Sequence, residues 1–308
     1  MKPVKIVFLV LPRVHLIDFA GPAQVFLEAA GYGANISMEY CGAGLNVETS
    51  SNFPLGKLKS FKEVELSAGD YLFIPGAEVE YTLSKAMISQ HELFTWVRDA
   101  RSNHVNICSV CSGAFFLGIA GILDGLKCTT HWKRTAELKQ RFPSIELMEN
   151  VLFIEDDGVY TSAGVTAGID MSLAILTKLT DDSTSFKVAR EMVVYSRRGS
   201  SDPQLSPLMD YRNHIHAGIH KLQDYMIGNI AKKVSLSQLA DEACMSTRSL
   251  TRIFKKETGI TVNEYTNLIR KTMLRELSRN PDMTRKQMAN HCGLRSERQI
   301  LRLMKEIA

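Results

Sequence analysis

The chain has 308 residues, of which 45% are apolar and 23% are charged. This composition suits a globular protein rather than a disordered one, and the length predicts one large and one small domain or two medium ones. Lys and Arg number 37 against 33 Asp and Glu, a net charge of +4 at neutral pH. The total charge by itself therefore assigns no partner.

The chain begins with an apolar run, VKIVFLVLP (4–12), which predicts a buried β-strand. Pro12, Arg13 and Asp18 follow where a signal peptide would carry small residues for cleavage. We therefore expect a cytoplasmic protein, in which the six cysteines stay reduced.

Apolar strand-like runs then alternate with helical patterns as far as residue 180. The later predicted strands are YLFIPG (71–76), VNICSVC (105–111) and GVYTSAG (158–164), and the predicted helices include AGPAQVFLEAAG (20–31), HELFTWVRDAR (91–101) and GIDMSLAILTKLT (168–180). Such an alternation predicts a parallel sheet with helices on both faces, the doubly wound α/β class. The uncharged run 102–123 is long enough to cross a membrane, but its polar first half and three glycines favour a buried strand, turn and helix. We expect no membrane partner.

Cys111 ends one of these strands and is followed by a Ser-Gly turn and a helical run. This is the layout of a nucleophile elbow, in which a tight turn presents the side chain and the next helix offers amide groups. That environment predicts a lowered thiol pKa and a place for an anion. Both an enzyme and a pocket that only binds fit this layout. Cys108 and Cys111 form a lone C-x-x-C, and His216 and His220 lie beyond the domain boundary, so we expect no metal and no cofactor.

A segment rich in Ser and Pro, GSSDPQLSPLMD (199–210), predicts a linker. We place the linker at 196–214, between a domain at 1–195 and a domain at 215–308. Residues 1–195 contain 17 Lys and Arg against 22 Asp and Glu, a net of −5, and residues 196–308 contain 20 against 11, a net of +9. A basic second domain favours nucleic acid or an anionic surface as a partner, and a merely solvated helical surface is the alternative.

The second domain contains an internal repeat. SLSQLADEACMSTRSLTRIFKKETG (235–259) recurs as TRKQMANHCGLRSERQILRLMKE (284–306), with a small residue between two helical patterns in each copy. This predicts two helix-turn-helix units, each with a second helix that offers cations at i, i+4 and i+7 to a major groove. The expected DNA contacts are Thr247, Arg248, Thr251, Arg252, Lys255, Arg298, Gln299, Arg302 and Lys305. A bundle that docks an acidic protein is the alternative.

Residues 215–308 resemble the double helix-turn-helix domain of AraC/XylS-type transcriptional activators. The segment MSTRSLTRIFKKETG (245–259) carries most of the likeness, although Cys244 stands where glycine is usual in that family. The resemblance implies sequence-specific binding to double-stranded DNA at a promoter, with activation as the expected outcome and RNA polymerase as a candidate partner.

The first domain resembles the ThiJ/PfpI class, within the class I glutamine amidotransferase-like, flavodoxin-like folds. The likeness covers about residues 3–190 and rests on IDFAGPAQVF (17–26), IPG (74–76), SVCSGAFFLG (109–118), TTHW (129–132) and TSAGVTAGIDM (161–171). Together with the tail, the whole chain resembles regulators of the GlxA type. The resemblance implies Cys111 as the elbow cysteine, Asp18 as the acid facing it, Gly76 and Ser112 as backbone amides of an anion pocket, and His131 as the histidine after the elbow helix.

Departures from this class decide which function we expect. Ser112 occupies the position where PfpI-type proteases have histidine, and Ala163-Gly164-Val165 lacks the His-x-Glu of amidotransferases. We therefore expect a sensor rather than an enzyme, which binds a small metabolite, such as an amine or amino-acid derivative, and acts as a homodimer through the first domain. The expected ligand-binding residues are Asp18, Gly76, Cys111, Ser112, His131 and Trp132. An aromatic ring such as that of Trp132 can hold an ammonium group, and simple packing is the alternative for this residue.

The alternative to a sensor is a Cys-dependent hydrolase, or an enzyme like the isocyanide hydratases of the same class. Its catalytic residues would be Cys111, Asp18 and His131. A carboxylate beside a thiolate requires one of the two groups to be protonated, as in the hydratase branch.

Overall fold

The computed structural model describes residues 2–194, 198–232, 234–278 and 283–305. The chain divides into two compact units, Met1–Gln204 and Leu205–Ala308. The division falls inside the segment 196–214 that we predicted as the linker. Among the described residues, no helix is both long enough and apolar enough to cross a bilayer.

The first unit is built on a seven-stranded sheet in the order β10-β11-β7-β6-β1-β2-β5. Its strands are β1 (Val4–Leu9), β2 (Ile36–Gly42), β5 (Lys59–Ser60), β6 (Tyr71–Ile74), β7 (Asn106–Val110), β10 (Phe153–Asp156) and β11 (Val159–Ser162). All neighbours are parallel except β10, which runs antiparallel to β11. The minor strands are β3 (Val47–Glu48), β4 (Pro54–Leu55), β8 (Lys127–Cys128) and β9 (Glu146–Leu147), and the short 3₁₀ turns are Phe61–Glu63 and Trp132–Arg134.

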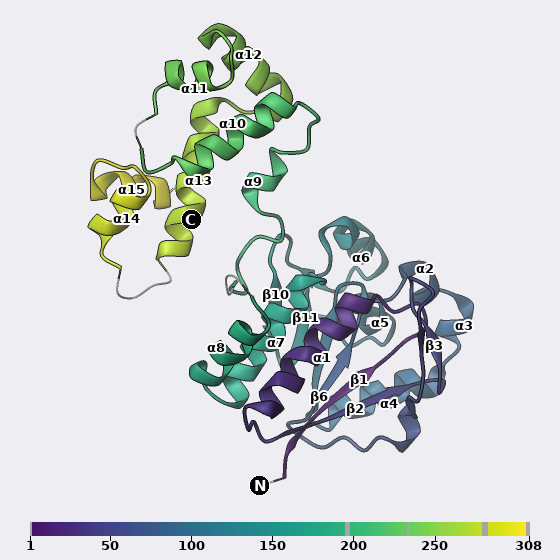
Figure 1. The fold of residues 1–308 in the computed structure, drawn as a ribbon. Helices are drawn as coiled ribbons and strands as arrows, with labels where there is room; N and C mark the ends of the chain where they lie inside the picture. The colour runs from purple at the N-terminus through teal and green to yellow at the C-terminus, as the bar shows by residue number, and fades with distance from the viewer. Residues whose placement is uncertain (1, 195–197, 233, 279–282, 306–308) are drawn as a thin grey trace. The chain divides into compact units, whose positions relative to one another are not determined.

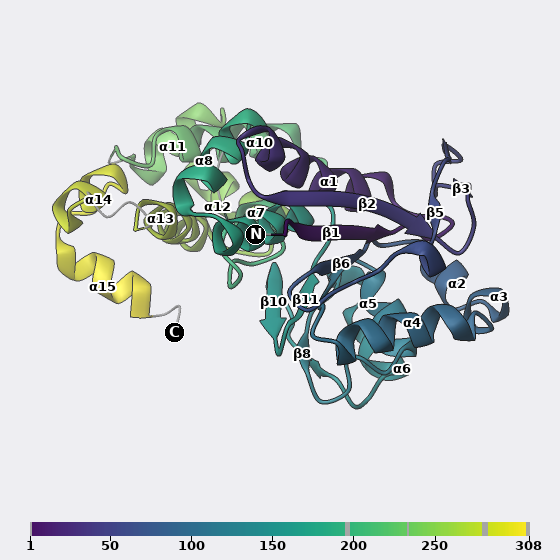
Figure 2. The same cartoon turned by 90° about the horizontal axis from the view of Figure 1, so that it is seen from below.

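Helices cover both faces of this sheet (Figures 1 and 2). One face carries α1 (Leu16–Gly31), α7 (Thr166–Leu179) and α8 (Asp182–Glu191), and the other carries α2 (Val79–Thr82), α3 (Lys85–Ile88), α4 (His91–Ser102), α5 (Gly113–Ile119) and α6 (Thr135–Arg141). Alternate residues of β1 point to opposite faces: Val7 and Leu9 pack toward α4 and α5, whereas Ile6 and Phe8 pack toward α1 and α7. The prediction of a doubly wound parallel sheet is confirmed.

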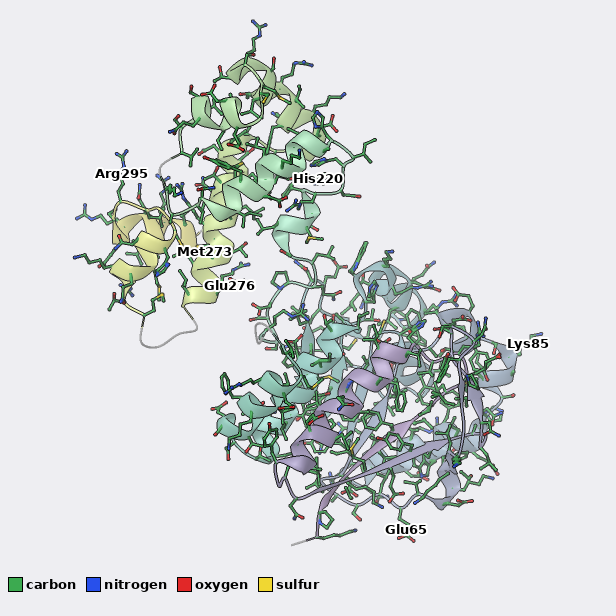
Figure 3. The ribbon with its side chains drawn as sticks, viewed as in Figure 1. Glu65, Lys85, His220, Met273, Glu276 and Arg295 are labelled. Carbon is green, nitrogen blue, oxygen red and sulfur yellow. The ribbon has the colours of Figure 1, made fainter. Side chains whose placement is uncertain are left out.

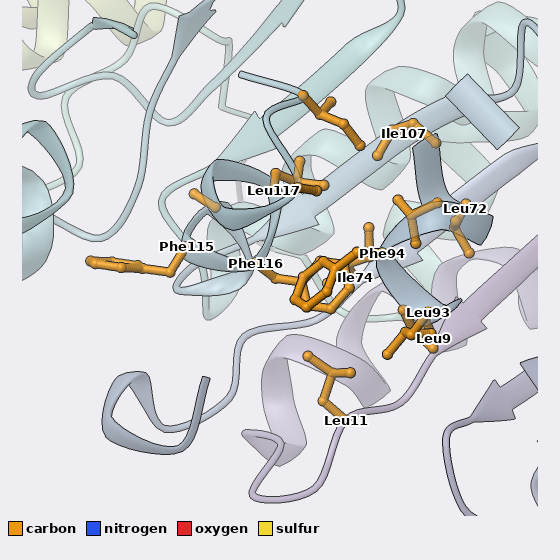
Figure 4. Close-up of a cluster of buried hydrophobic side chains, with 14 of the residues drawn as sticks. Leu9, Leu11, Leu72, Ile74, Leu93, Phe94, Ile107, Phe115, Phe116 and Leu117 are labelled. Atoms are coloured by element: carbon orange, nitrogen blue, oxygen red, sulfur yellow. The ribbon is translucent and has the colours of Figure 1, made fainter. Parts of the chain in front are cut away.

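The core on the α4 and α5 side consists mainly of branched aliphatic and aromatic side chains (Figure 4). Leu72 and Ile74 of β6 contribute to it, and the rings of Phe94 and Phe116 stack with their centroids 4.6 Å apart. These side chains are fully or almost fully buried. Because each such burial contributes about 1.5–3 kcal/mol, the continuous apolar runs of the sequence become the central strands.

All of the regular secondary-structure elements in the described part of the second unit are helices. Its elements are α9 (Pro207–Asp210), α10 (Ala217–Gly228), α11 (Leu236–Glu242), α12 (Thr247–Thr258), α13 (Val262–Leu277), α14 (Arg285–His291) and α15 (Glu297–Lys305). Capping boxes start three of these helices, at Ser235, Thr261 and Thr284, where the side chain and backbone of the cap residue exchange hydrogen bonds with Gln or Glu three residues later. Two separate apolar clusters, one around Leu250 and Phe254 and the other around Ile300 and Leu303, give each helix pair its own core.

Candidate functional site

Cys111 lies on a strained turn between β7 and α5. Its φ is +56°, in the left-handed region that residues other than glycine rarely adopt. The turn is held by hydrogen bonds on both sides: the Cys111 N–H donates to the Ser162 carbonyl (2.9 Å), and the Thr130 hydroxyl donates to the Cys111 carbonyl (2.8 Å). Such a conformation costs about 1–3 kcal/mol and persists only where its surroundings enforce it.

Gly164, in the turn between β11 and α7, is pressed directly against this cysteine. A Cβ at Gly164 would lie 2.2 Å from Cys111 Cβ and 2.7 Å from its Sγ, and the φ of Gly164 is +89°. The next residue, Val165, also has a positive φ of +51° although it is β-branched, and it is the cap residue of α7. The start of α7 is therefore fixed in an unfavourable conformation beside the thiol.

Asp18 explains how that conformation is held. This residue lies in the first turn of α1 and is 1% exposed. Its Oδ1 accepts a hydrogen bond from the Val165 N–H (2.6 Å), whereas its buried Oδ2 has no hydrogen-bond partner. A Cβ at Gly76 would lie 2.5 Å from that Oδ2 and 3.0 Å from Cys111 Cβ, so both groups pack against the Gly76 backbone where a side chain would otherwise lie.

The predicted lowering of the Cys111 pKa is wrong. Burial raises the pKa of the thiol, and the Asp18 carboxyl beside it raises the pKa further. Burial likewise raises the pKa of Asp18, although the Val165 N–H opposes that rise. The amide groups at the start of α5 do not outweigh burial next to a carboxyl. The site therefore favours a protonated thiol at neutral pH.

A pocket of about 630 Å³ opens beside these groups. Four of the expected ligand-binding residues line it, namely Asp18, Cys111, Ser112 and His131. The Ser112 hydroxyl donates its hydrogen bond to the buried Ala77 carbonyl (2.6 Å), so it cannot donate to a ligand at the same time. Gly76 does not line the pocket; atoms of Asp18, Ser112 and Cys111 pack where its side chain would be.

The pocket also has charged walls that the sequence did not predict. Glu78 and Glu80 line it together with Lys133 and Arg134. Glu80 accepts from Arg134 (3.1 Å), and Glu78 accepts two hydrogen bonds from Arg13, which lies outside the lining (2.8 and 3.1 Å). Carboxylates and cations thus share one cavity.

His15 and Ser50 complete the rim of the pocket, and neither was predicted. The His15 Nδ1 lies 3.0 Å from the Ser50 hydroxyl. The loop after β1 supplies His15, and the loop that joins β3 to β4 supplies Ser50. A polar residue soon after a parallel strand was the available signal for His15, because such loops gather at the carboxyl edge of the sheet.

His131 and Trp132 are arranged differently from what we expected. Burial lowers the pKa of His131, which favours its neutral imidazole, and its Nδ1 accepts from the Lys133 N–H (3.3 Å). No hydrogen bond between the described atoms joins His131 to Cys111. Trp132 does not belong to the lining of the pocket; it is 45% exposed, and its ring carries the Lys133 ammonium 5.2 Å from the ring centroid. The ammonium group on the Trp132 ring therefore belongs to Lys133 of the same chain and not to a ligand.

The expected DNA contacts lie on two exposed helix faces. On α12, Thr247, Arg248, Thr251, Arg252 and Lys255 are exposed; on α15, Arg298, Gln299 and Arg302 are exposed, and the Lys305 side chain lies outside the described residues. The four arginines among them form no ion pair with any described residue. The turn before α12 contains Cys244 with a φ of +54°, which accounts for the usual glycine at this position. Gln299 is partly engaged, since its Oε1 accepts from the Arg295 N–H (2.7 Å).

The turn of the second helix pair packs closely against α13 and the connection after α10. Arg270 of α13 donates through Nε to the Cys292 carbonyl (3.0 Å), and a Cβ at Gly293 would lie 2.3 Å from the Ile230 carbonyl oxygen. Only glycine fits this approach. The side chain of Arg295, which follows this turn, projects away from the helices (Figure 3).

Among the described residues, no group of three or more His, Cys, Asp and Glu side chains is placed to hold a metal ion.

Comparison with known families identifies both units. The DJ-1/PfpI family model matches residues 4–178, and the model for bacterial regulatory helix-turn-helix proteins of the AraC family matches residues 226–267. Both resemblances that the sequence motifs indicated are confirmed.

Known relatives fall into two groups. The transcriptional regulator GbdR of Pseudomonas aeruginosa is 27% identical over 212 residues, which are 68% of this chain and 57% of GbdR, so the chain spans little more than half of that regulator's length. The isonitrile hydratase of Pseudomonas putida is 24% identical over 233 residues, which are 74% of this chain and 97% of the hydratase. A crystal structure of an AraC family transcriptional regulator from Pseudomonas putida superposes with a TM-score of 0.53 at 21% identity, covering 62% of this chain and 100% of that one, which supports the fold.

Proposed function

Because the chain belongs to the DJ-1/PfpI family and also carries an AraC-family helix-turn-helix segment, we propose that it is a transcriptional regulator that binds DNA and responds to a small metabolite. The observation that carries the DNA-binding part is the pair of exposed helix faces whose arginines form no ion pair with a described residue. Exposed guanidinium groups without a carboxylate partner among the described residues are available to phosphates and to guanine edges. Promoter activation, a homodimer through the first unit and contact with RNA polymerase belong to the same proposal.

DNase footprinting with the full-length chain tests DNA binding. Arg248→Ala should weaken specific binding by about 5- to 150-fold, the equivalent of about 1–3 kcal/mol for a lost base contact. Lys221→Ala is the matched control, because it removes one exposed cation from α10 of the same unit but from neither recognition helix. Equal losses in the two variants would mean that charge alone drives binding. The absence of any protected duplex at low salt would contradict the proposal.

The lining of the pocket supports an amine or amino-acid derivative as the ligand. Asp18, Glu78 and Glu80 provide carboxyl groups on the walls, and Lys133 and Arg134 provide cations. A ligand with one positive and one negative group matches such mixed walls better than a ligand of a single charge, since each of its charges finds an opposite partner. Titration of the full-length chain with a panel of amines, carboxylic acids and amino acids, followed by calorimetry, tests this match.

One observation favours an enzyme as the second candidate. The match to the hydratase spans nearly its whole length, and Asp18 lies beside Cys111 as that branch requires. Two observations weigh against chemistry at the thiol: its raised pKa, and the absence of a hydrogen bond from His131 among the described atoms. Sustained isonitrile turnover that disappears in Cys111→Ala would replace the sensor by the enzyme.

A further inference from the structure

Residues 198–204, which we call the strap, directly precede the second unit and are hydrogen bonded to the first unit at both ends. At one end the Arg198 guanidinium donates to Asp170 Oδ2 (3.0 and 2.5 Å) and to Thr166 Oγ1 (2.7 Å). At the other end the Gln204 side-chain amide donates to the Thr130 carbonyl (2.9 Å). The Ser200 carbonyl between them accepts from the Leu152 N–H (3.0 Å). The predicted linker thus contains an ordered part.

Both anchoring elements of the strap also hold the pocket. Thr166 and Asp170 lie in the first turns of α7, which begins directly after Val165, and the Val165 N–H donates to Asp18. Thr130 contributes its carbonyl to the strap and its hydroxyl to the Cys111 carbonyl. Val165 directly precedes Thr166, so a movement of Val165 shifts the first turns of α7, where Thr166 and Asp170 hold Arg198. A movement of Cys111 shifts Thr130, which holds Gln204.

The two ends of the strap differ in strength. Asp170 is 5% exposed, and its ion-pair partner among the described residues is Arg198, whose side chain is 32% exposed. Loss of Arg198 from this end would leave the buried Asp170 carboxylate unpaired, which is costly. At the other end the buried Oε1 of Gln204 has no hydrogen-bond partner. An unsatisfied buried polar atom weakens the attachment, because that atom would gain a hydrogen bond in water. Gln204 is still held by three hydrogen bonds, from its side-chain amide to the Thr130 carbonyl (2.9 Å) and Thr129 Oγ1 (3.3 Å) and from its N–H to Asn150 Oδ1 (3.2 Å). This end is therefore attached by neutral hydrogen bonds, whereas the Arg198 end is attached by an ion pair.

The start of α7 can respond to the pocket because it is strained. Val165 keeps a positive φ that a β-branched side chain avoids, and Asp18 stabilises this conformation through the Val165 N–H. The second carboxyl oxygen of Asp18 is buried against Gly76 and has no hydrogen-bond partner among the described atoms. A ligand that draws the Asp18 carboxyl into the pocket takes Oδ1 away from the Val165 N–H, and the loss of that bond lets the strained turn relax.

We propose that the strap transmits occupancy of the pocket to the DNA-binding unit: a ligand on Asp18 releases the Val165 turn, shifts the first turn of α7 and so changes the hold on Arg198 and Gln204. This inference rests on the proposed sensor function. Arg198 and Gln204 act as positioning residues in it, since neither lines the pocket. The ligand changes DNA affinity only by its different affinity for the held and released strap.

A pocket variant can stand in for the ligand in the test. Gly76→Ala places a methyl group 2.5 Å from the free Asp18 oxygen and displaces that carboxyl permanently. Asp18→Ala, which deletes the bond to Val165, is the second mimic in case one variant folds poorly. Each is made in the full-length chain, once with the strap intact and once with the strap detached by Asp170→Asn, Arg198→Gln and Gln204→Ala. Asp170 and Arg198 are replaced together because Arg198→Gln alone would leave the buried Asp170 carboxylate without its ion-pair partner.

DNA affinity is measured by fluorescence anisotropy, and hydrogen exchange is followed in the peptides that contain 166–170 and 198–204. With the strap intact, each mimic should change DNA affinity by about 5- to 150-fold and should speed exchange in both peptides. With the strap detached, the same mimics should change DNA affinity less than about twofold, which corresponds to about 0.4 kcal/mol through RT ln 2. Lys187→Gln, an exposed cation on α8 outside the strap, should preserve the full response.

If the pocket variants change DNA affinity equally with the strap intact and with the strap detached, the strap does not transmit the signal. The proposed sensor function would then still stand, with coupling by another route. No response to either mimic with the strap intact would overturn the strap and the sensing together, while footprinting of the unmodified chain still reports on DNA binding separately.

Discussion

Gly164→Ala should destabilise the first unit by an amount that the structure sets. The added Cβ would meet Cys111 Cβ at 2.2 Å, against about 3.5–4.0 Å for carbon atoms in contact, so the turn has to open by more than about 1 Å. Overpacking of this kind costs about 1–3 kcal/mol, and the positive φ of +89° costs an L-residue about 1–2 kcal/mol more. The reduced entropy of the unfolded chain offsets about 0.4–1 kcal/mol. The net loss of unfolding free energy is about 1–4.6 kcal/mol.

Tryptophan fluorescence isolates this effect, because the two tryptophans, Trp96 and Trp132, both lie in the first unit. For a unit of this size the expected loss lowers Tm by about 2–18 °C. Gly31→Ala is the matched control: Gly31 ends α1, has no atom within 4 Å of an added Cβ, and should be neutral or slightly stabilising. A Tm for Gly164→Ala within about 1 °C of the unmodified chain would refute the close approach of the turn to Cys111.

Two further predictions concern the thiol and the second helix pair. Because burial and Asp18 raise the pKa of Cys111, iodoacetamide at pH 7.5 should modify it far more slowly than the exposed Cys244, and the rate should climb with pH. Asp18→Asn removes the neighbouring charge, lowers that pKa and should accelerate the modification, measured by peptide mass spectrometry; an unchanged rate contradicts this. Arg270→Ala removes the bond to the Cys292 carbonyl and should shorten the footprint by about one helical turn of DNA, whereas a full-length footprint would show that this bond does not position α15.

The sequence predicted the centre of the sheet better than its edges. β1, β6 and β7 are mainly apolar and mostly buried, and β11 is buried throughout although it contains Thr and Ser. β2 was not predicted, because most of its residues are only half buried and its sequence has no continuous apolar run. The antiparallel edge strand β10 was also missed, and none of its residues is fully buried. β10 has one free side, so burial constrains its residues less.

Motifs located the centre of the candidate site but not its walls or its electrostatics. Asp18, Gly76 and Cys111 belong to short sequence motifs, and the structure brings the three together. Glu78 and Ser50 come from loops whose convergence depends on the whole fold, and no local pattern indicates it. The thiol pKa was predicted in the wrong direction because a local turn and helix say nothing about how deeply the turn is buried.

The same limit applies to the strap. Its Ser and Pro content predicts a flexible linker, but its attachments join residues far apart in the chain: Arg198 bonds to Asp170, 28 residues earlier, and Gln204 bonds to Thr130, 74 residues earlier. Composition reports on local backbone preference, and such long-range bonds leave no local signal.

The distribution of strain in the first unit supports the sensor function proposed above. An enzyme that uses a cysteine nucleophile needs a thiolate and a base within hydrogen-bond reach, and this site instead raises the pKa of Cys111 and leaves His131 without a bond to it among the described atoms. What the site does hold is a strained turn at Val165 that depends on one hydrogen bond to Asp18. A catalytic centre gains from rigidity at such a point, whereas a sensor gains from a conformation that one ligand contact can release. The energy stored beside the pocket is thus placed where occupancy can use it, at the start of the helix that holds the chain leading to the DNA-binding unit.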